Sequence, residues 1–392
     1  MEEGWEYKKL GDVCQSDLGK TLNQSKDTGD LYPYLCAVNI LWDKIDLSTL
    51  KQTRFEKTEL ERYSVRKGDL LVCEGGDIGR AAIWDRDEVI QYQNALHRIR
   101  FNGEILPRFC LLYLRNLKQK GILDHKYGKG VTILHLVKSS LLSIPIPIPS
   151  ISEQQQIVSE LDLLSGVIEK QKAQLEELDK LAQSIFYDMF GDPVTNEKGW
   201  EVKKLCDIAS FKNGINYHAG DKGDTIKFIG VGDFKNNNEI RCFEDVKTIQ
   251  IEDIIDESYL LRDGDILIVR SNGSKDLVGR NMIVYTSGEE ITYSGFCIRC
   301  RVDDNAIIPL FLNRILSDRN TMKILRQEGQ GCNISNINQK ILSSLSIVFP
   351  PLTLQQEFAA KVEAIEAMKA KVRQSLKEAE TLFNERMDYY FS

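Results

Sequence analysis

Short apolar runs make up most of the chain, and in two places they give way to a long helical pattern. Over residues 1–150 the apolar and β-branched residues come in short runs separated by Gly, Asn and Asp, which is typical of strands joined by turns. One helix-like stretch interrupts them near residues 109–118. Residues 191–351 have the same character. The pattern therefore predicts two β-rich globular domains.

A different pattern follows each domain. After a proline-rich run that ends at Pro149, Ser152 has the character of a helix N-cap. The apolar residues beyond it recur in alternating steps of four and three, which is the seam of a coiled coil, with Gln171 at one seam position. A second helix repeats the phase, with Lys369 as its polar interruption. The predicted seam residues are Ile157, Leu161, Leu164, Ile168, Leu175, Leu178 and Ile185 in the first helix, and Phe358, Val362, Ile365, Val372, Leu376 and Phe383 in the second.

The length of these helices favours pairing between them. About 38 residues at about 1.5 Å each give a helix of about 60 Å, which is longer than a domain of this size is wide. The alternative is that each helix packs on its own domain. We expect an α+β fold in which β-rich domains at 1–150 and 191–351 are followed by helices at 151–190 and 352–392. These helices pair as an antiparallel coiled coil and keep the two domains at a fixed spacing.

The chain also contains an internal repeat. Segment 5–12 returns at 200–207, and segment 65–72 returns at 261–268. Later blocks return at a constant shift of 201 residues: Tyr92 with Tyr293, Arg98 with Arg299, Arg100 with Arg301, Gly128 with Gly329, and Gln154 with Gln355. Five blocks in the same order do not arise by chance, so the two domains are copies of one unit.

Composition is that of a globular protein, but the net charge is unusual for a protein that binds nucleic acid. With 392 residues the chain can form two cores, and 42% of the residues are hydrophobic and 28% charged. The net charge is −7, whereas phosphate contacts call for Lys and Arg. Residues 1–150 carry 22 Lys and Arg against 20 Asp and Glu, and residues 151–190 carry 3 against 8. If the chain binds DNA, we expect a basic partner to supply part of the affinity.

The same survey predicts the compartment. Apolar runs are too short to span a bilayer, and the N-terminus at Met1 lacks the features of a signal peptide. The nine cysteines follow no regular framework, which favours reduced thiols. We therefore expect a cytoplasmic protein that does not contact a membrane.

Motifs for phosphate or metal binding are incomplete. The run Leu18-Gly19-Lys20-Thr21 matches the end of a phosphate-binding loop, but Cys14 stands where that motif has Gly. Cys297 and Cys300 have the spacing of half a zinc site, yet they fall in a strand-like run and no second pair accompanies them. Neither run predicts a site.

Other candidates for catalysis also have simpler explanations. The glycine-rich segment 228–234 resembles a methyltransferase cofactor loop, but its counterpart at 34–40 has no glycine, so a repeated strand explains both. Asp69 and Asp265 repeat within a Gly-Asp turn, and we interpret them as turn residues while a functional role stays open. The four histidines have no repeating acid or nucleophile beside them. We expect a chain without catalytic residues, bound cofactor or metal.

The order of the repeated blocks resembles the specificity subunits of type I restriction-modification systems. Each unit opens with Trp-x-x-x-x-Leu-x-Asp, passes a Gly-Asp-Leu/Ile-Leu strand, and closes with a proline run, paired Gln and a long helix. The resemblance covers essentially the whole chain. Cys206 stands where the first unit has Gly11, and the loops around 271–278 are longer than their counterparts.

The resemblance implies a function and a set of partners. Each domain would be a target recognition domain that reads one half of a bipartite site in double-stranded DNA. The helices would be spacer regions that bind two methyltransferase subunits. S-adenosylmethionine would bind to those partners, which methylate adenine, and cleavage would need restriction subunits.

The turns hold side chains suited to DNA. Asn or Gln can pair bidentately with adenine, and Arg or Lys with guanine, while hydroxyls reach phosphates. The predicted DNA-binding residues are Lys20, Thr21, Asn23, Gln91, Tyr92, Gln93, Asn94, Lys129 and Thr132 in the first domain, and Asn213, Asn216, Tyr217, Asn272, Ser274, Lys275, Tyr293, Asn333, Ser335 and Asn336 in the second. For each of them, ordinary solvation of a loop is the alternative.

Two rival functions follow from the same features. A scaffold that joins two protein partners without reading DNA would also use two domains on paired helices. A fusion of methyltransferase and nuclease is a further alternative, and the missing motifs disfavour it.

Overall fold

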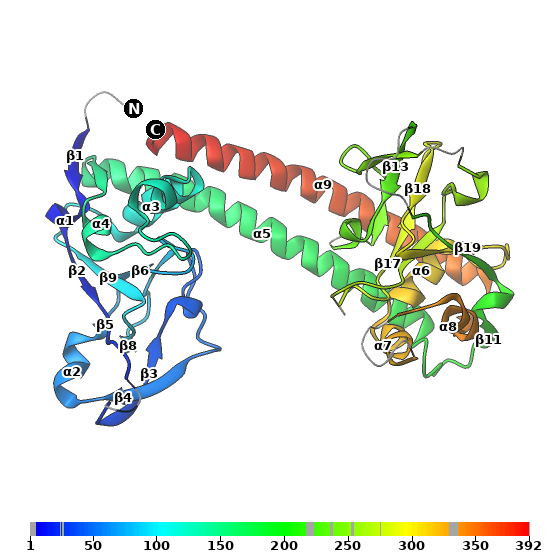
Figure 1. Ribbon diagram of the computed structural model, residues 1–392, viewed down its shortest axis with the longest axis horizontal. Helices are drawn as coiled ribbons and strands as arrows, with labels where there is room; N and C mark the ends of the chain where they lie inside the picture. The colour runs from blue at the N-terminus through cyan, green and yellow to red at the C-terminus, as the bar shows by residue number, and fades with distance from the viewer. Residues whose placement is uncertain are drawn as a thin grey trace. The chain divides into compact units, whose positions relative to one another are not determined.

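The computed structural model describes residues 5–23, 25, 27–216, 223–235, 238–251, 255–274, 276–328 and 336–391. They form two compact units, the first made of Met1–Ala173 with Arg373–Ser392 and the second of Gln174–Val372. Each unit therefore combines one β-rich region with parts of both long helices (Figure 1). The domain boundaries expected from the sequence, 1–150, 151–190, 191–351 and 352–392, remain a prediction.

The first unit is built mainly from short strands. Its elements are β1 (Glu6–Lys9), α1 (Leu10–Val13), β2 (Cys14–Leu18), β3 (Asp30–Leu35), β4 (Lys51–Phe55), α2 (Lys57–Arg62), β5 (Ser64–Val65), β6 (Leu70–Cys73), β7 (Ala81–Ile83), β8 (Ile90–Tyr92), β9 (Leu96–Phe101), α3 (Pro107–Gln119), α4 (Lys138–Leu142), β10 (Pro145–Ile148) and the start of α5 (Ile151–Phe190). Two four-stranded sheets have the orders β2-β9-β6-β7 and β4-β3-β8-β5, and β1 pairs with β10. All these neighbours are antiparallel except β3 and β8.

The second unit repeats this plan with sheets of five and three strands in place of four and four. Its elements are β11 (Glu201–Lys204), β12 (Ala209–Asn213), β13 (Asp224–Ile229), β14 (Glu239–Ile240), β15 (Thr248–Ile251), β16 (Ile266–Val269), β17 (Asn281–Val284), β18 (Ile291–Tyr293), β19 (Cys297–Val302), α6 (Pro309–Ser317), α7 (Arg319–Glu328), α8 (Gln339–Ser344), β20 (Ser346–Phe349) and the start of α9 (Leu352–Phe391). The sheets have the orders β12-β19-β16-β17-β14 and β15-β13-β18, and β11 pairs with β20.

The core of each unit includes both long helices. In the first unit, Leu161 of α5 and Phe391 of α9 join the cluster that contains Leu70 of β6 and Phe109 of α3. The Phe109 and Phe391 rings meet edge to face with centroids 5.4 Å apart. The end of α9 is thus part of the same hydrophobic core as the first β-rich region.

In the second unit, four phenylalanines anchor the other ends of these helices. Phe186 and Phe190 of α5 pack with Phe311 of α6 and Phe358 of α9. The Phe190 ring lies 4.7 Å from that of Phe311 and 5.5 Å from that of Phe358, centroid to centroid. Phe358 was predicted as a seam residue, whereas Phe186 and Phe190 were not. They follow the apolar residues Ile185 and Met189 directly, so the apolar face widens at this end of α5.

A buried glutamine fixes the start of each long helix. The Gln154 side chain is fully buried, accepts from the Leu106 amide at 2.8 Å and donates to the carbonyls of Glu104 (2.8 Å) and Pro149 (3.0 Å). Gln355 makes the same three contacts in the second unit, with the amide of Ile308 and the carbonyls of Ala306 and Pro350. The repeated Gln of the sequence therefore satisfies buried backbone groups, which are costly to leave unpaired.

The two long helices pack against each other and run antiparallel. In the first unit, Gln171 Nε2 donates to Ser375 Oγ at 2.6 Å. In the second unit, Lys369 Nζ contacts Asp179 Oδ1 at 2.7 Å. Partner numbers on α9 fall as those on α5 rise, which confirms the antiparallel pairing, and both polar seam positions bond across it.

Every predicted seam side chain is buried or half-buried. The alternative, in which each helix packs on its own domain, was wrong because the two helices pack against each other. The helix ends do also pack on the β-rich regions.

Candidate nucleic-acid interface

Several loops of the first unit meet at one end of its sheet. The ends of β2 and β6 lie beside the start of β9, because Leu18 pairs with His97 and Cys73 pairs with Leu96. Segment 129–136 joins them, since the Leu136 amide donates to the Glu74 carbonyl at 2.6 Å. We call this group of loops, made of residues 19–23, 74–79, 93–95 and 129–136, the first sheet end.

The second unit has the same arrangement. Asn213 at the end of β12 pairs with Ile298, and Val269 at the end of β16 pairs with Cys297. The Ile337 amide donates to the Arg270 carbonyl at 2.9 Å and brings the segment that begins at 336 to the same place. Residues 214–216, 270–279 without 275, 294–296 and 336–337 form the second sheet end.

A glycine lets two loops cross at each sheet end. A Cβ added to Gly19 would lie 2.4 Å from the Tyr92 carbonyl oxygen, and one added to Gly214 would lie 2.3 Å from the Tyr293 carbonyl oxygen. In each unit, the amide of the residue after the glycine donates to that same carbonyl at 3.0 Å. The Gly19-Lys20-Thr21 run is therefore a loop crossing of the fold, and its glycine serves close backbone approach.

Most predicted DNA-binding residues that the structure describes lie at the two sheet ends with accessible side chains. The exposed ones are Thr21, Asn23, Lys129 and Thr132 in the first unit and Asn216, Ser274 and Asn336 in the second. The half-buried ones are Gln93, Asn94, Asn213 and Asn272. The predicted residues Tyr217, Lys275, Asn333 and Ser335 lie outside the described residues.

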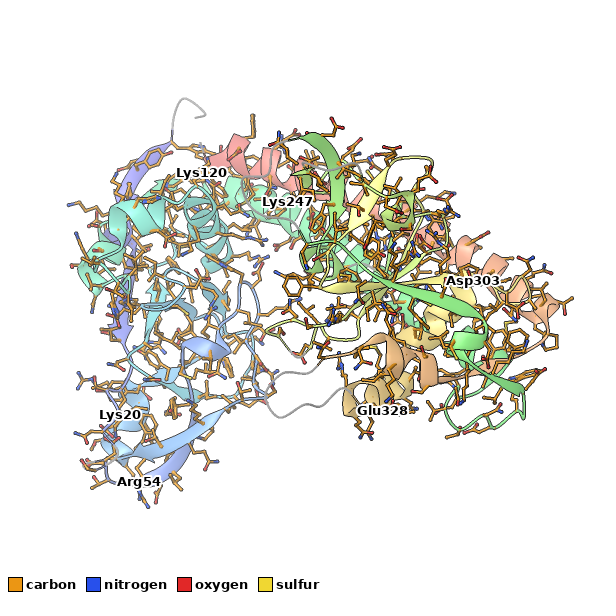
Figure 2. The ribbon with its side chains drawn as sticks, turned by 45° about the vertical axis from the view of Figure 1, so that its right-hand side comes forward. Lys20, Arg54, Lys120, Lys247, Asp303 and Glu328 are labelled. Atoms are coloured by element: carbon orange, nitrogen blue, oxygen red, sulfur yellow. The ribbon has the colours of Figure 1, made fainter. Side chains whose placement is uncertain are left out.

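Lys20 differs from the expectation, because its side chain lies inside the first unit. Its ammonium group contacts Glu59 Oε2 at 2.6 Å and the Arg54 carbonyl at 2.9 Å, with Asp27 3.5 Å away. Lys20 and Arg54 lie at the same end of the first unit (Figure 2). Burial by itself would lower the pKa of Lys20, but Glu59 and Asp27 raise it above its ordinary value, so the group stays charged. This charge is already compensated within the unit and is not available to a phosphate.

Three more predicted residues have interior side chains. Gln91 donates to the Leu60 carbonyl at 2.9 Å and is 6% exposed. The hydroxyls of Tyr92 and Tyr293 donate to backbone carbonyls at 3.2 and 3.1 Å, and both side chains are fully buried. Burial raises the pKa of Tyr293 to about 12 and that of Tyr92 further, so both remain neutral donors. As placed, these side chains hold the sheets together and do not face DNA.

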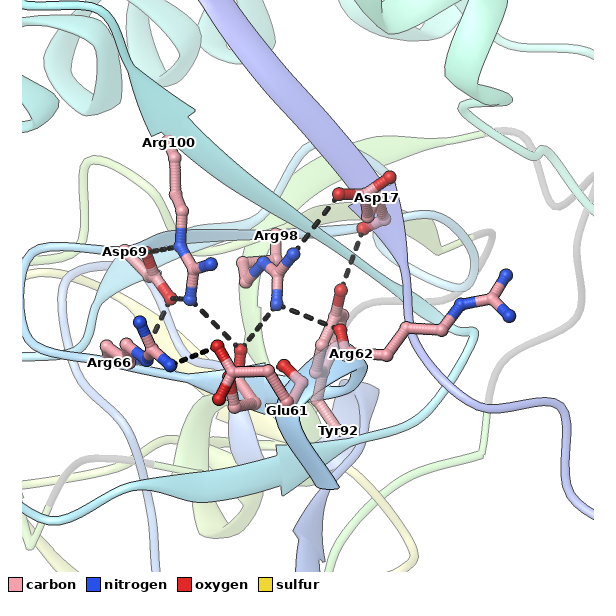
Figure 3. A network of polar contacts seen from close by, with 9 residues as sticks. Asp17, Glu61, Arg62, Arg66, Asp69, Tyr92, Arg98 and Arg100 are labelled. Atoms are coloured by element: carbon pink, nitrogen blue, oxygen red, sulfur yellow. Dashed lines mark hydrogen bonds and ion pairs between the residues drawn. The ribbon is translucent and has the colours of Figure 1, made fainter. Parts of the chain in front are cut away.

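Each unit contains an arginine-aspartate pair whose carboxylate is buried. Arg100 binds Asp69 through two parallel hydrogen bonds of 2.7 and 2.9 Å, and Asp69 also accepts from the Arg66 amide (Figure 3). Arg301 binds Asp265 in the same way at 2.7 and 2.6 Å. Such bidentate pairs have strong, directional hydrogen bonds. The repeated Asp of the Gly-Asp turn thus has an internal partner, in agreement with its interpretation as a turn residue.

A second repeated arginine closes the same network. Arg98 donates to the Ser64 carbonyl at 2.6 Å and contacts Asp17 Oδ2 at 3.1 Å, and its guanidinium lies over the Tyr92 ring (Figure 3). Arg299 donates to the Ser258 carbonyl at 2.7 Å. Arg98 thus binds a carbonyl of β5 in the neighbouring sheet, whereas Arg299 binds one in the short helix Glu257–Tyr259.

Sequence reasoning missed the exposed apolar side chains at the sheet ends. Val131 is fully exposed and Ile133 is 62% exposed on the segment that also carries Lys129 and Thr132. Phe296 is 59% exposed at the second sheet end. Apolar groups there can contact thymine methyl groups. The available signal was an apolar pair inside a Gly-rich polar turn.

The metal candidates have structural roles in the described part of the chain. Cys297 and Cys300 are buried on opposite faces of β19, in two different hydrophobic clusters. Among the described residues, no group of three or more His, Cys, Asp or Glu could hold a metal ion. Within these same residues, no helix is long and apolar enough to cross a membrane.

Comparison with known proteins defines the class. The model of the type I restriction modification DNA specificity domain matches residues 2–180 and again residues 197–380, so the chain belongs to this family. Its fold is that of two repeated specificity domains whose long helices pack against each other.

Named relatives agree with this class. The StySPI specificity subunit of Salmonella potsdam is 31% identical over 65% of this chain, and the match spans 58% of that subunit, which is less than two thirds of its length. The putative MjaX specificity subunit of Methanocaldococcus jannaschii is 26% identical over 93% of this chain and 88% of its own length.

Two solved structures share the fold. The type I S subunit from M. genitalium has a TM-score of 0.56 and 15% identity, over 98% of this chain and 95% of the other. A chain from a study of complex assembly and conformational transition of the type I R-M system has a TM-score of 0.59 and 17% identity, over 99% and 98%.

Proposed function

We propose that this chain reads a bipartite DNA target, one half with each sheet end, and directs partner methyltransferase and restriction subunits to it. The observation that carries the proposal is the repetition of one loop arrangement with different side chains. The first sheet end presents Thr21, Asn23 and Lys129, and the second presents Asn216, Ser274 and Asn336. Two domains that share one scaffold but present different surfaces are suited to a DNA target whose two halves differ in sequence.

The buried residues support this division of roles. Arg100 with Asp69 and Arg301 with Asp265 hold equivalent positions in the two units, so the strands that lead to the sheet ends are supported in the same way in both. Side chains positioned by a rigid scaffold lose less freedom on binding. The chain's own residues bind and orient DNA, and S-adenosylmethionine binds to the methyltransferase partners.

The paired helices are the proposed attachment for those partners. Between the two anchored ends, exposed side chains on α5 and α9 include Leu163, Val167, Met368 and Leu382. Apolar groups on a solvent-facing helix surface are suited to burial by further helices. Two methyltransferase subunits would supply the positive charge that the net charge of −7 lacks.

A domain exchange tests the proposal. Residues 1–150 are replaced by the corresponding segment of a relative with a different target, and the chimera is co-expressed with its methyltransferase subunits. Sequencing of the methylated sites is expected to show one half-site changed and the other retained. A well-folded, active chimera that altered both halves together would contradict the two-reader proposal.

Gel retardation separates this function from the scaffold alternative. The chain assembled with methyltransferase subunits is expected to retard a target duplex more strongly than a scrambled duplex, and more strongly than methyltransferase subunits alone. A scaffold that does not read DNA would show equal retardation of both duplexes.

A further inference from the structure

A wide polar cleft opens in the second unit, beside the second sheet end. Its volume is about 1190 Å³, and it lies between α7, the segment that leads into β17, and the second half of α5. Asp276 and Arg280 on its wall belong to the segment that begins at the second sheet end. None of its lining residues was among the residues predicted from the sequence.

The charge of this cleft is strongly positive. Among the described lining residues, Arg280, Arg319, Lys323 and Arg326 face a single carboxylate, that of Asp276. Arg280 donates to the Lys235 carbonyl at 2.7 Å, and Arg326 donates to the Asp276 carbonyl at 2.9 Å. Carbonyl partners hold these two guanidinium groups in place and leave their charge uncompensated.

The other two cations are exposed. In the part of the chain that the structure describes, the side chains of Arg319 and Lys323 have no hydrogen-bond or ion-pair partner. With Arg326 they follow positions i, i+4 and i+7 of α7, so all three lie on one face. Like charges at this spacing destabilise a helix, while the buried face of α7 is formed by Thr321 and Leu325. Arg319 and Lys323 therefore oppose helix stability and contribute nothing to the core.

A basic residue of the first unit provides a contrast. Lys118 lies near the end of α3, the helix that corresponds to α6. Its ammonium group contacts Asp77 and Asp124, both at 2.8 Å. This cation is compensated inside its unit, whereas Arg319 and Lys323 have no such carboxylate partner among the described residues.

We propose that this cleft binds phosphate groups of the DNA backbone next to the half-site read by the second sheet end. Arg319 and Lys323 would bind the phosphates directly, while Arg280 and Arg326 supply a fixed positive potential. Guanidinium and ammonium groups are the usual donors to phosphate oxygens, and such contacts hold the register of a protein on DNA without reading sequence. The inference rests on the proposed function and adds an affinity site to the second unit.

The test uses the chain assembled with its methyltransferase subunits and measures the affinity for target and scrambled duplexes over a range of NaCl concentrations. Arg319→Ala with Lys323→Ala is expected to weaken binding to both duplexes on the order of ten-fold at low salt. The slope of log affinity against log salt should fall by about 1.8, because each phosphate contact contributes about 0.9. The methylated sequence should not change.

A matched control removes the same charges elsewhere in the second unit. Lys204 and Arg262 are exposed outside the second sheet end and the cleft, and Lys204→Ala with Arg262→Ala should leave affinity and slope unchanged. A cleft variant with the affinity and salt slope of the parent would overturn the inference. A cleft variant that assembled poorly with methyltransferase subunits, while the complex that did form bound DNA with unchanged affinity, would also overturn the inference. The cleft would then bind an acidic surface of a partner protein. Failure of the proposed function would appear in the parent complex, as equal affinity for target and scrambled duplexes.

Discussion

The two units agree in their interior and differ at their surface. Both contain a bidentate Arg-Asp pair whose carboxylate is buried, both use a glycine where two loops cross, and both fix a long helix with a buried Gln. The exposed side chains at the two sheet ends have little in common, and the basic cleft belongs to the second unit. Duplication has kept the residues that satisfy buried polar groups, whereas the loops that face solvent were free to diverge.

One interior position breaks this rule. His97 and Ile298 occupy the same place in the register, at the start of β9 and β19, where they pair with Leu18 and Asn213. His97 is fully buried, and its Nε2 lies 2.7 Å from the Leu136 carbonyl, which ties segment 129–136 to the first sheet end. The first unit therefore has a titratable group where the second has an alkyl chain.

The largest expected effect comes from breaking the buried pair. Asp265→Ala leaves Arg301 without its carboxylate and the Arg262 amide without its acceptor, and should lower the free energy of unfolding by roughly 3–5 kcal/mol in urea denaturation. Asp69→Ala should cost less, because the side chain of Arg100 is 33% exposed and that of Arg301 is 18% exposed. A loss below about 1 kcal/mol for Asp265→Ala would contradict the assigned role of the pair.

The crossing glycines should respond equally in the two units. Gly19→Ala and Gly214→Ala each drive a Cβ into a backbone carbonyl, which should lower the free energy of unfolding by about 1–3 kcal/mol. Gly232→Ala is the control, since an added Cβ there meets no atom within 4 Å. The same denaturation series measures all three, and a crossing variant as stable as the control would show that the loops can separate at no cost.

A pH series should distinguish the first unit from the second. Burial lowers the pKa of His97, so the folded state resists the proton that the unfolded chain accepts. Stability contributed by neutral His97 is present above about pH 6.5 and is lost as the pH falls through that value toward the folded pKa. His97→Gln keeps a donor for the Leu136 carbonyl and should remove this dependence. If that variant kept the same dependence of stability on pH, His97 would not be the group responsible for it.

The smallest effect is expected in the helix pair. Arg386 and Tyr390 donate to Glu160 across α5 and α9 in the first unit and lower the pKa of that carboxyl. The stability that ionised Glu160 contributes is present above about pH 4.5 and is lost as the pH falls through the pKa of Glu160 in the folded state. Because Glu160 is partly exposed, Glu160→Gln should cost at most about 1 kcal/mol at neutral pH. Glu177→Gln, which pairs only within its own helix, is the control, and equal losses in both variants would argue against the contact across the helices.

Periodicity and repetition in the sequence were enough to predict two β-rich units, two long helices and their antiparallel pairing. Those features depend on regular spacing, which a chain displays directly: steps of four and three for the helices, and a shift of 201 for the copies. The side chains at the predicted seam positions are buried or half-buried, and Gln171 and Lys369 pair across the helices.

Only the tertiary structure decided which polar residues face solvent. Lys20, Gln91 and Tyr92 have the chemistry of DNA contacts, but Glu59, the Leu60 carbonyl and the Asp17 carbonyl hold them inside the first unit. Arg319 and Lys323 carried no motif, and their place on a cleft wall depends on where α7 lies against α5 and the start of β17. Whether a charged or polar side chain is available to a ligand depends on partners far away in the chain, and neither composition nor local spacing encodes them.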